Sequence, residues 1–340
     1  MKAVVYNESV PLDSPDALID TTLPEPVPAG YDLLVEVRSV SVNPVDTKIR
    51  GGVLPPPVEP KVLGWDAAGV VRAVGDRVTL FKPGDRVMYA GSLLRAGTNS
   101  ELHLVDERIV GPMPKRLSFE EAAALPLTAV TAWELLFDRL QVREGKNPIG
   151  VLVVIGGAGG VGSILIQLAR QLTGLTVVAT ASRPETREWV RELGAHHVID
   201  HTKPMAAQLR GLGIDEADYM ADYVASLTHT DKHLVDIAEM LAPQGKLGLI
   251  DDPESLDVPI LKPKSISLHW ELMYTRSMYQ TADMIEQHAI LVRIAALVDA
   301  GVLRTTLADL FGTINATNLR RAHALIESGK ARGKIVLSGF

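Results

Sequence analysis

The chain of 340 residues contains no cysteine. It can form no disulfide and offers no thiolate to a metal, which favours a reducing cytoplasm. Lysine and arginine form no run and the net charge is −7, so duplex nucleic acid and an anionic membrane are poor partners. No apolar run approaches the roughly 20 residues of a membrane span, and the N-terminal MKAVVYNESV has a strand pattern, not that of a signal peptide. We expect a cytoplasmic globular protein that acts on a small molecule.

A glycine-rich turn follows a short apolar strand near the middle of the chain. Residues 151–162 read VLVVIGGAGGVG, and the SILIQLARQL that follows has apolar side chains on one helical face. Strand, glycine turn and helix, in this order, are the context in which G-x-G-x-x-G indicates dinucleotide binding. The first glycine permits the tight turn, the second lets backbone amides approach a pyrophosphate, and the third lets the helix pack on the strand. A glycine turn without a ligand is the alternative. The predicted pyrophosphate-binding residues are Gly157, Ala158, Gly159, Gly160, Val161 and Gly162.

The next strand, TVVATA at 176–181, bears on the choice between NADH and NADPH. NAD sites usually carry Asp or Glu at the end of this strand, where it holds the ribose 2′-hydroxyl. Here Ser182 and Arg183 follow, so no carboxylate repels a 2′-phosphate and a guanidinium can pair with it, with help from Arg187. The alternative role of Arg183 is to cap or solvate the helix at 185–193. We predict NADPH.

The character of the chain changes along its length. Residues 1–120 are β-rich, with short alternating runs between turn signals. A helix is expected over 120–136, with Ser118 as N-cap and Glu121 completing a capping box. From 151 to about 259 strands alternate with helices, which predicts a parallel doubly wound sheet. Its expected strands are 151–155, 176–181, 197–200, 219–225 and 247–251. A strand at 265–270, helices near 281–300 and 317–328 and a strand at 334–337 follow, and the last is expected to return to the first domain.

These features together resemble the medium-chain dehydrogenase/reductase superfamily over essentially the whole chain. Within it, the chain is similar to the zinc-independent quinone oxidoreductase branch, in the subgroup named zinc-type alcohol dehydrogenase-like. The motifs that carry the resemblance, besides the glycine turn, are NPVD at 43–46, GWDAAG at 64–69, KPGDRV at 82–87, AAALPLTAVTAW at 122–133, ESG at 327–329 and GKIVL at 333–337. The resemblance implies an α/β protein: a GroES-like β-rich catalytic domain over 1–125 and 271–340, and an inserted Rossmann domain with a doubly wound parallel sheet over 126–270.

Zinc dehydrogenases of this superfamily hold catalytic zinc with Cys, a Gly-His-Glu segment and a further Cys or acid, and structural zinc with four cysteines. Here the segment reads Gly64-Trp65-Asp66, cysteine is absent, and the nine histidines are scattered. Because a tetrahedral catalytic site needs three protein ligands plus water, we predict neither zinc.

Without a Lewis acid, simple carbonyls are poorly polarised and alcohols are hard to deprotonate. Quinones and α,β-unsaturated carbonyls are already electrophilic, so we predict an NADPH-dependent reductase that transfers hydride to one of them. One alternative is a non-catalytic NADPH-binding protein with a structural or sensory role. Another is a zinc-independent enoyl-thioester reductase, which would need a basic groove for a CoA or carrier phosphate.

The resemblance places the catalytic candidates Asn43 and Asp46 on a loop that faces the nicotinamide. The third catalytic candidate, Lys48, stands where some relatives have tyrosine, and its role would be to stabilise an enolate. Each has a plainer alternative: Asn43 makes a turn before Pro44, Asp46 pairs with Lys48 or Arg50, and Lys48 is a surface lysine. No side chain stands out as the proton donor, and water can serve. The other cofactor-binding candidates that the resemblance implies are Thr128, Thr131, His201, Ser226, Ile250 and Asp251.

The acceptor pocket is expected to be lined by Leu54, Trp65, Tyr89, Trp270 and Met273. Aromatic residues are only 5% of the chain, so Trp270 and Tyr274 beside Met273 are notable. The alternative for this segment is a dimer seam, formed by Ile266, Leu268, Trp270 and Leu272 across a two-fold axis. Both can hold together, and we expect a homodimer.

Overall fold

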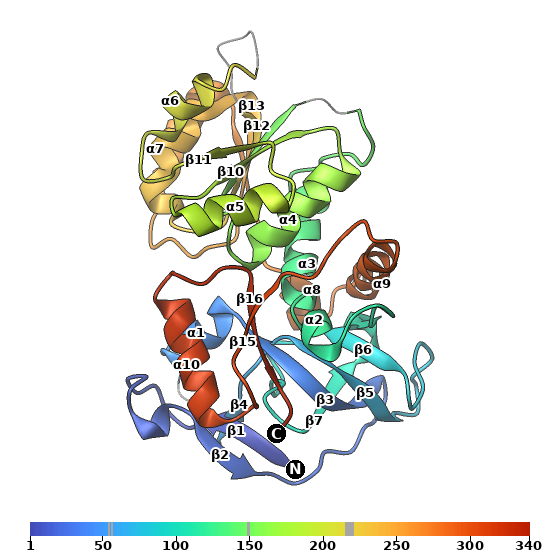
Figure 1. Cartoon of the computed structure of the whole chain (residues 1–340). Helices are drawn as coiled ribbons and strands as arrows, with labels where there is room; N and C mark the ends of the chain where they lie inside the picture. Colours follow the sequence, from blue (N-terminus) through green and yellow to red (C-terminus); the bar gives the residue numbers. More distant parts are fainter. Residues whose placement is uncertain (54, 56, 148–149, 215–220) are drawn as a thin grey trace. The chain divides into compact units, whose positions relative to one another are not determined.

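The computed structural model describes residues 1–53, 55, 57–147, 150–214 and 221–340. They form two compact units, one made of Met1–Val130 with Tyr274–Phe340 (unit 1) and the other of Thr131–Met273 (unit 2). Unit 1 is therefore built from both ends of the chain, coloured blue to green and orange to red in Figure 1. None of the helices in these described ranges is both long and apolar enough to span a membrane. The domain limits at 125/126 and 270/271 stay a prediction.

Unit 1 contains a seven-stranded and a three-stranded sheet (Figure 1). The larger has the order β15-β16-β3-β5-β6-β8, with β7 also on β3. Its strands are β3 (Asp32–Val42), β5 (Ala67–Val74), β6 (Arg86–Tyr89), β7 (Leu102–Asp106), β8 (Val110–Pro112), β15 (Leu307–Leu310) and β16 (Lys334–Ser338). The smaller has β1 (Lys2–Tyr6) between β2 (Ile19–Thr22) and β4 (Lys61–Val62).

Strand β3 is the centre of the larger sheet, because β5, β7 and β16 all pair with it antiparallel. Its sequence LLVEVRSVSV alternates, and Leu33, Val35 and Val37 are buried. Strand β16 lies beside the end of β3, with Val336 opposite Ser41. The expected return of the last strand to the first domain is confirmed.

The helices of unit 1 are short, apart from two near the C-terminus. They are α1 (Pro44–Arg50), α2 (Phe119–Ala123), α8 (Thr275–Tyr279), α9 (Glu286–Asp299) and α10 (Ala316–Glu327), with 3₁₀ turns η1 (Pro15–Ala17) and η2 (Glu107–Ile109). The predicted capping box of α2 is present: the Ser118 amide donates to the Glu121 carboxylate at 2.9 Å, and the Glu121 amide donates to the Ser118 hydroxyl at 3.2 Å.

The single helix expected over 120–136 is instead three elements. Helix α2 ends at Ala123, α3 covers Pro126–Trp133, and a π-helical turn, η3, covers Glu134–Arg139. Proline at the start of α3 has no amide hydrogen and disfavours a helical residue before it, so the helix breaks there.

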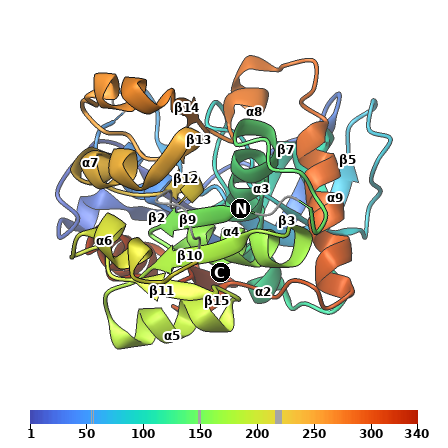
Figure 2. The ribbon, with the colours of Figure 1, turned by 90° about the horizontal axis from the view of Figure 1, so that it is seen from above.

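Unit 2 has a six-stranded parallel sheet with the order β11-β10-β9-β12-β13-β14, viewed from above in Figure 2. The strands are β9 (Val151–Ile155), β10 (Thr176–Thr180), β11 (His197–Ile199), β12 (Ala221–Ser226), β13 (Leu241–Leu249) and β14 (Ser267–Trp270). The helices are α4 (Gly160–Leu172), α5 (Pro184–Glu192), α6 (Met205–Arg210) and α7 (Thr230–Met240), with a 3₁₀ helix η4 (Val258–Lys264). The predicted doubly wound sheet is confirmed, and its strand order reverses direction beside β9.

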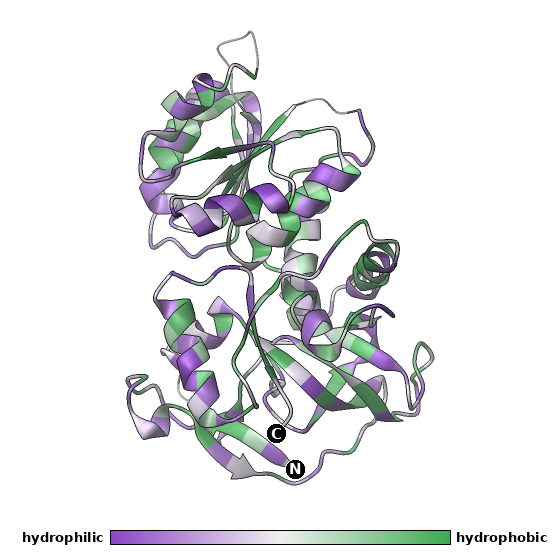
Figure 3. Ribbon diagram, in the orientation of Figure 1, coloured by the Kyte–Doolittle hydropathy of each residue, from purple (hydrophilic) through white to green (hydrophobic). Residues whose placement is uncertain are grey.

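The core of unit 2 explains the apolar runs in the sequence. Side chains of β9, β12 and β13 form one buried cluster with α6, α7 and η4. In Figure 3 the strands of this sheet are mostly hydrophobic, whereas α5 is largely hydrophilic. Because both faces of a parallel sheet are covered, its strands read as continuous apolar segments.

Candidate functional site

The first candidate site lies in unit 1, where β3 ends and α1 begins. Asn43 is the N-cap of α1, and Pro44 takes the first helical position, where no amide donor is needed. The backbone amide of Asn43 donates to Oδ2 of Asp46 at 2.7 Å. Both side chains are buried, Asp46 with only 1% exposed. The plainer prediction of a turn at Asn43 therefore holds, and the same turn places a buried carboxyl group next to it.

Asp66 accepts hydrogen bonds from four directions. Its Oδ2 accepts from the Ser41 hydroxyl at 3.0 Å, the Asn43 side-chain amide at 2.9 Å and the Lys334 ammonium at 3.0 Å. Its Oδ1 accepts from the backbone amide of Leu127 at 2.8 Å. We call Ser41, Asn43, Asp46, Asp66 and Lys334 the Asp66 cluster.

Lys334 supplies the positive charge of this cluster. Its ammonium donates to the Val42 carbonyl at 3.2 Å, to Oδ1 of Asn43 and to Asp66. An ammonium has three hydrogens, so these three acceptors use all of them. The Asn43 amide is thereby fixed in orientation, with its NH₂ on Asp66 and its oxygen on Lys334.

The two carboxyl groups of the cluster differ in their surroundings. Burial raises the pKa of Asp46 to about 7, against the opposing effects of the Asn43 amide and the Lys334 charge. Burial also raises the pKa of Asp66, and the adjacent Lys334 ammonium opposes that rise. Asp46 can therefore gain and lose a proton near neutral pH, while the Lys334 ammonium favours the charged form of Asp66.

The structure places the other residues predicted for catalysis and the acceptor pocket as follows. Lys48 is exposed on α1. Trp65 and Tyr89 are fully buried in unit 1: the Trp65 indole donates to the Ser92 carbonyl at 3.1 Å, and the Tyr89 hydroxyl bonds Nδ1 of His103 at 3.1 Å. Leu54 lies outside the described residues. In unit 2, Met273 is buried and Trp270 is 53% exposed on β14. Their role in an acceptor pocket stays a prediction.

The second candidate site is the glycine turn of unit 2, between β9 and α4. A Cβ on Gly162 would lie 2.6 Å from the carbonyl oxygens of Gly156 and Gly157, so no side chain fits there. A Cβ on Gly157 would lie 3.0 Å from Cβ of Ala179. A Cβ on Gly159 would meet nothing nearer than 3.5 Å. The folded protein therefore requires glycine at 162 but leaves Gly159 open. Such an open backbone at a helix N-terminus fits a phosphate group. Ala158, Gly160 and Val161 complete this turn and are half-buried.

The residues predicted to recognise the 2′-phosphate lie near the ends of β10 and β11. Arg183 is half-exposed and its Nε lies 2.7 Å from Oε1 of Glu185. Arg187 instead donates to the carbonyls of Ala181 at 3.1 Å and Val198 at 3.3 Å, so it ties the two strand ends together. Ser182 precedes Arg183. The His201 ring meets that of His233 edge to face, 6.2 Å between centroids.

Most of the remaining predicted cofactor residues make hydrogen bonds within the fold. Ser226 bonds Thr230 through their hydroxyls at 2.7 Å, and Asp251 accepts from the Thr230 amide at 2.8 Å. Ile250 follows β13, and its backbone amide donates to the Ser226 carbonyl at 3.4 Å. On α3, Thr128 donates to the Leu125 carbonyl at 3.1 Å, and Thr131 is buried. Asp251 thus caps α7, and cofactor binding by these residues stays a prediction.

A buried pair of carboxyl groups in unit 2, Glu134 and Glu271, was not predicted from the sequence. Glu271 follows β14 and accepts from Nε of Arg139 at 2.8 Å, while Glu134 starts the π-helical turn that also carries Arg139. Burial and the neighbouring Glu134 raise the pKa of Glu271 to about 9, against the effect of Arg139. The pair of Glu134 and Glu271 therefore retains a proton at neutral pH. No local sequence pattern predicts that Glu271 contacts Arg139 of the π-helical turn. Such turns nevertheless occur often at functional positions.

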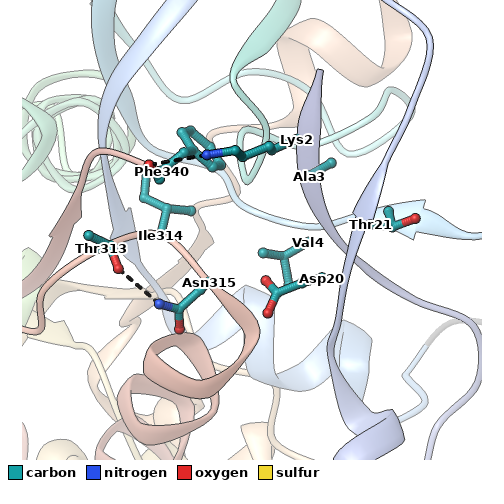
Figure 4. Close-up of a pocket in the computed structure, with 9 residues that line it drawn as sticks. All are labelled: Lys2, Ala3, Val4, Asp20, Thr21, Thr313, Ile314, Asn315 and Phe340. Atoms are coloured by element: carbon teal, nitrogen blue, oxygen red, sulfur yellow. Dashed lines mark hydrogen bonds between the residues drawn. The ribbon is translucent and has the colours of Figure 1, made fainter.

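A cavity of about 240 Å³ in unit 1 lies apart from all of these residues (Figure 4). It is lined by Lys2, Ala3, Val4, Asp20, Thr21, Thr313, Ile314, Asn315 and Phe340. The Asn315 amide donates to the Thr313 hydroxyl at 2.9 Å and the Lys2 ammonium to the Phe340 carbonyl at 3.5 Å. No residue of the Asp66 cluster contributes to it.

Known families match both units. The alcohol dehydrogenase GroES-like domain matches residues 29–115, and the zinc-binding dehydrogenase domain matches residues 193–337. Within the described ranges, no three His, Cys, Asp or Glu side chains are grouped to hold a metal ion. The donors at the segment that holds catalytic zinc in zinc dehydrogenases are an indole and a carboxylate that already accepts four hydrogen bonds, and they do not fit zinc.

Two curated relatives define the similarity. A zinc-type alcohol dehydrogenase-like protein of Staphylococcus aureus (strain MSSA476) is 40% identical over 92% of this chain and 92% of its own length. The quinone oxidoreductase of Mus musculus is 35% identical over 64% of this chain and 60% of its own length.

Solved structures agree. A protein of Rhizobium etli CFN 42, named as a candidate zinc-dependent alcohol dehydrogenase, is 57% identical with a TM-score of 0.95, over 100% of this chain and 98% of that one. A mycobacterial protein solved with NADPH is 26% identical with a TM-score of 0.84, over 99% and 100% of the two chains. The chain is an oxidoreductase of the medium-chain dehydrogenase/reductase superfamily, in its zinc-type alcohol dehydrogenase-like and quinone oxidoreductase-like branch.

Proposed function

We propose that this chain is an NADPH-dependent reductase that transfers hydride to a quinone or an α,β-unsaturated carbonyl without zinc. The observation that carries the proposal is the hydrogen bonding of Asp66, whose two oxygens accept from Ser41, Asn43, Lys334 and Leu127. Oδ2 of Asp66 already accepts three hydrogen bonds and Oδ1 one, and the neighbouring Trp65 has only an indole N–H, which is a donor. This segment therefore does not supply the three protein ligands that a catalytic zinc needs.

The acceptor class follows from this chemistry. Without a Lewis acid, the acceptor must delocalise negative charge onto oxygen as hydride arrives, as quinones and enones do. The Asp66 cluster contributes the buried Lys334 ammonium and the Asn43 side-chain amide, and their hydrogen bonds hold both groups in fixed orientations. Preorganised dipoles of this kind stabilise developing charge without reorganising during the reaction.

The residues of unit 2 fit the cofactor. The open backbone at Gly159 and the N-terminus of α4 would hold the pyrophosphate. Arg183 would face the 2′-phosphate, together with Ser182 and His201, which are predicted for the same part of the cofactor. No carboxylate directly follows β10. When bound, the reduced nicotinamide supplies the hydride.

We also propose a homodimer in the cytoplasm. In the described residues β14 is an edge strand of the sheet, with Trp270 53% and Leu272 50% exposed. An exposed apolar edge strand is suited to pairing with its own copy across a two-fold axis.

The test is NADPH oxidation, followed by absorbance, with a panel of quinones, enones and simple aldehydes, with and without a chelator, and with NADH in parallel. We expect turnover of quinones or enones that resists the chelator and is faster with NADPH. Chelator-sensitive turnover of aldehydes would contradict the zinc-free mechanism. Tight NADPH binding without turnover would favour a binding protein.

A further inference from the structure

Tyr274 is a buried residue of unit 1 whose hydroxyl has no use within the fold. It precedes α8, and only 3% of its surface is exposed. Its backbone carbonyl accepts from the Ser277 hydroxyl at 3.1 Å, but its own hydroxyl has no hydrogen-bond partner among the described residues. An unpaired buried hydroxyl destabilises a folded protein, so such a group in a native structure calls for a ligand, a water or a catalytic role.

Two carboxyl groups of the Asp66 cluster, those of Asp46 and Asp66, are near enough to this hydroxyl to act on it electrostatically. Burial raises the pKa of Tyr274 well above its usual value, and the nearby charges of Asp46 and then Asp66 raise it further. The phenol therefore keeps its hydrogen at neutral pH and has it to donate, in a hydrogen bond or as a proton.

The other donors of the cluster are already used. Lys334 donates its three ammonium hydrogens to Val42, Asn43 and Asp66. The Asn43 amide donates to Asp66, and the Ser41 hydroxyl does the same. Among the described residues, the Tyr274 hydroxyl thus has a hydrogen to give and no hydrogen-bond acceptor for it.

We infer that the Tyr274 hydroxyl binds the acceptor oxygen and gives it a proton during reduction, an inference that rests on the proposed function. The acceptor class is an oxygen that becomes anionic, as in a quinone or an enone carbonyl. Asp46, as the nearby group that titrates near neutrality, returns the proton to Tyr274.

The step balances. The hydride brings both electrons to the acceptor and leaves an oxyanion on it. The phenolic O–H bond of Tyr274 then breaks as a new O–H bond forms on that oxygen. The resulting phenolate takes a proton from the Asp46 carboxyl group, and Asp46 recovers one from water. The sum is NADPH, one proton and the acceptor giving NADP⁺ and the reduced acceptor.

The experiment compares Tyr274→Phe with Tyr6→Phe, a control at a buried tyrosine of the other sheet of unit 1. For each, kcat with the best acceptor, the NADPH dissociation constant and Tm without cofactor are measured. We expect Tyr274→Phe to lower kcat about 100-fold, the range for loss of a general acid, with NADPH affinity unchanged and Tm equal or higher. Tyr6→Phe should leave kcat unchanged.

The outcomes separate the two proposals. If the wild type reduces no acceptor, the proposed function fails and the inference falls with it. If the wild type is active and Tyr274→Phe keeps its kcat, only the inference is overturned, because a structural hydroxyl would change Tm alone. If Tyr274→Phe does not fold, 3-fluorotyrosine at position 274 keeps the shape and makes the phenol more acidic. A changed kcat then supports the inference, and an unchanged one overturns it.

Discussion

The two units build their candidate sites from different parts of the polypeptide. Unit 1 uses buried side chains, in which one ammonium holds an amide and a carboxylate in place. Unit 2 uses backbone, in a glycine turn where a missing Cβ matters more than any functional group. A side-chain site depends on compensated charges, whereas a backbone site depends on space. The two should therefore fail in different ways when they are altered.

The largest effect is expected from removing the cation of unit 1. Lys334→Met leaves Asp66 buried without its partner, which should lower the free energy of unfolding by about 3–5 kcal/mol. The measurement is thermal or urea unfolding at pH 7. Lys2→Met, at an exposed lysine, is the control, and Lys334→Met with Asp66→Asn should recover part of the loss. A stability close to that of the wild type would show that the charge of Lys334 does not hold this site.

A pair of glycine variants tests the role of space in unit 2. Gly162→Ala forces a Cβ against two carbonyl oxygens 2.6 Å away and should cost about 1–3 kcal/mol of stability. Gly159→Ala meets nothing nearer than 3.5 Å, so its stability should change by less than about 1 kcal/mol. NADPH affinity, measured by fluorescence titration, should nevertheless fall at least tenfold for Gly159→Ala. Equal effects of both variants on stability would contradict this division.

The carboxyl pair of unit 2 should make stability depend on pH. The pKa of Glu271 is about 9 in the folded state against 4.5 for the free group, so the folded state holds the extra proton. The resulting stability is present below about pH 4.5 and is lost as the pH rises through 9. Glu271→Gln cannot ionise, so between pH 6 and 7.5 its unfolding free energy should fall less than that of the wild type, by about 2 kcal/mol. The exposed Glu254→Gln is the control, and parallel pH profiles for wild type and Glu271→Gln would refute the protonated state.

The smallest effect is expected at the half-exposed Arg183. Arg183→Ala should weaken NADPH binding about fivefold, or about 1 kcal/mol, because Glu185 already shares the guanidinium. NADH binding should not change, since it lacks the 2′-phosphate. Arg191→Ala, on the exposed side of the same helix, should alter neither. Calorimetric titration with both cofactors measures the ratio, and equal losses for the two would remove Arg183 from the 2′-phosphate site.

How far the sequence predicts each site follows from the same contrast. The glycine turn, the α2 capping box and the alternation of strands and helices are encoded in neighbouring residues, and all were predictable. The Asp66 cluster joins Asn43 to Lys334 across 291 positions, through the pairing of β16 with β3. Its motifs could be recognised singly, but their contact depends on sheet register. Glu271 and Arg139 meet across 132 positions, and no local signal marks the π-helical turn.

The position of β16 also has a consequence for biosynthesis. Unit 2 is continuous in sequence, so it can begin to fold while the ribosome is still translating. Unit 1 must wait, because Lys334 is made 291 residues after Asn43, or roughly 15–60 s later at ~5–20 residues per second. During that interval Asp66 lacks the Lys334 ammonium that it pairs with in the folded unit. The N-terminal segment of unit 1 therefore stays incompletely folded until the C-terminal segment is made, and it is the part of the nascent chain that most needs protection by chaperones.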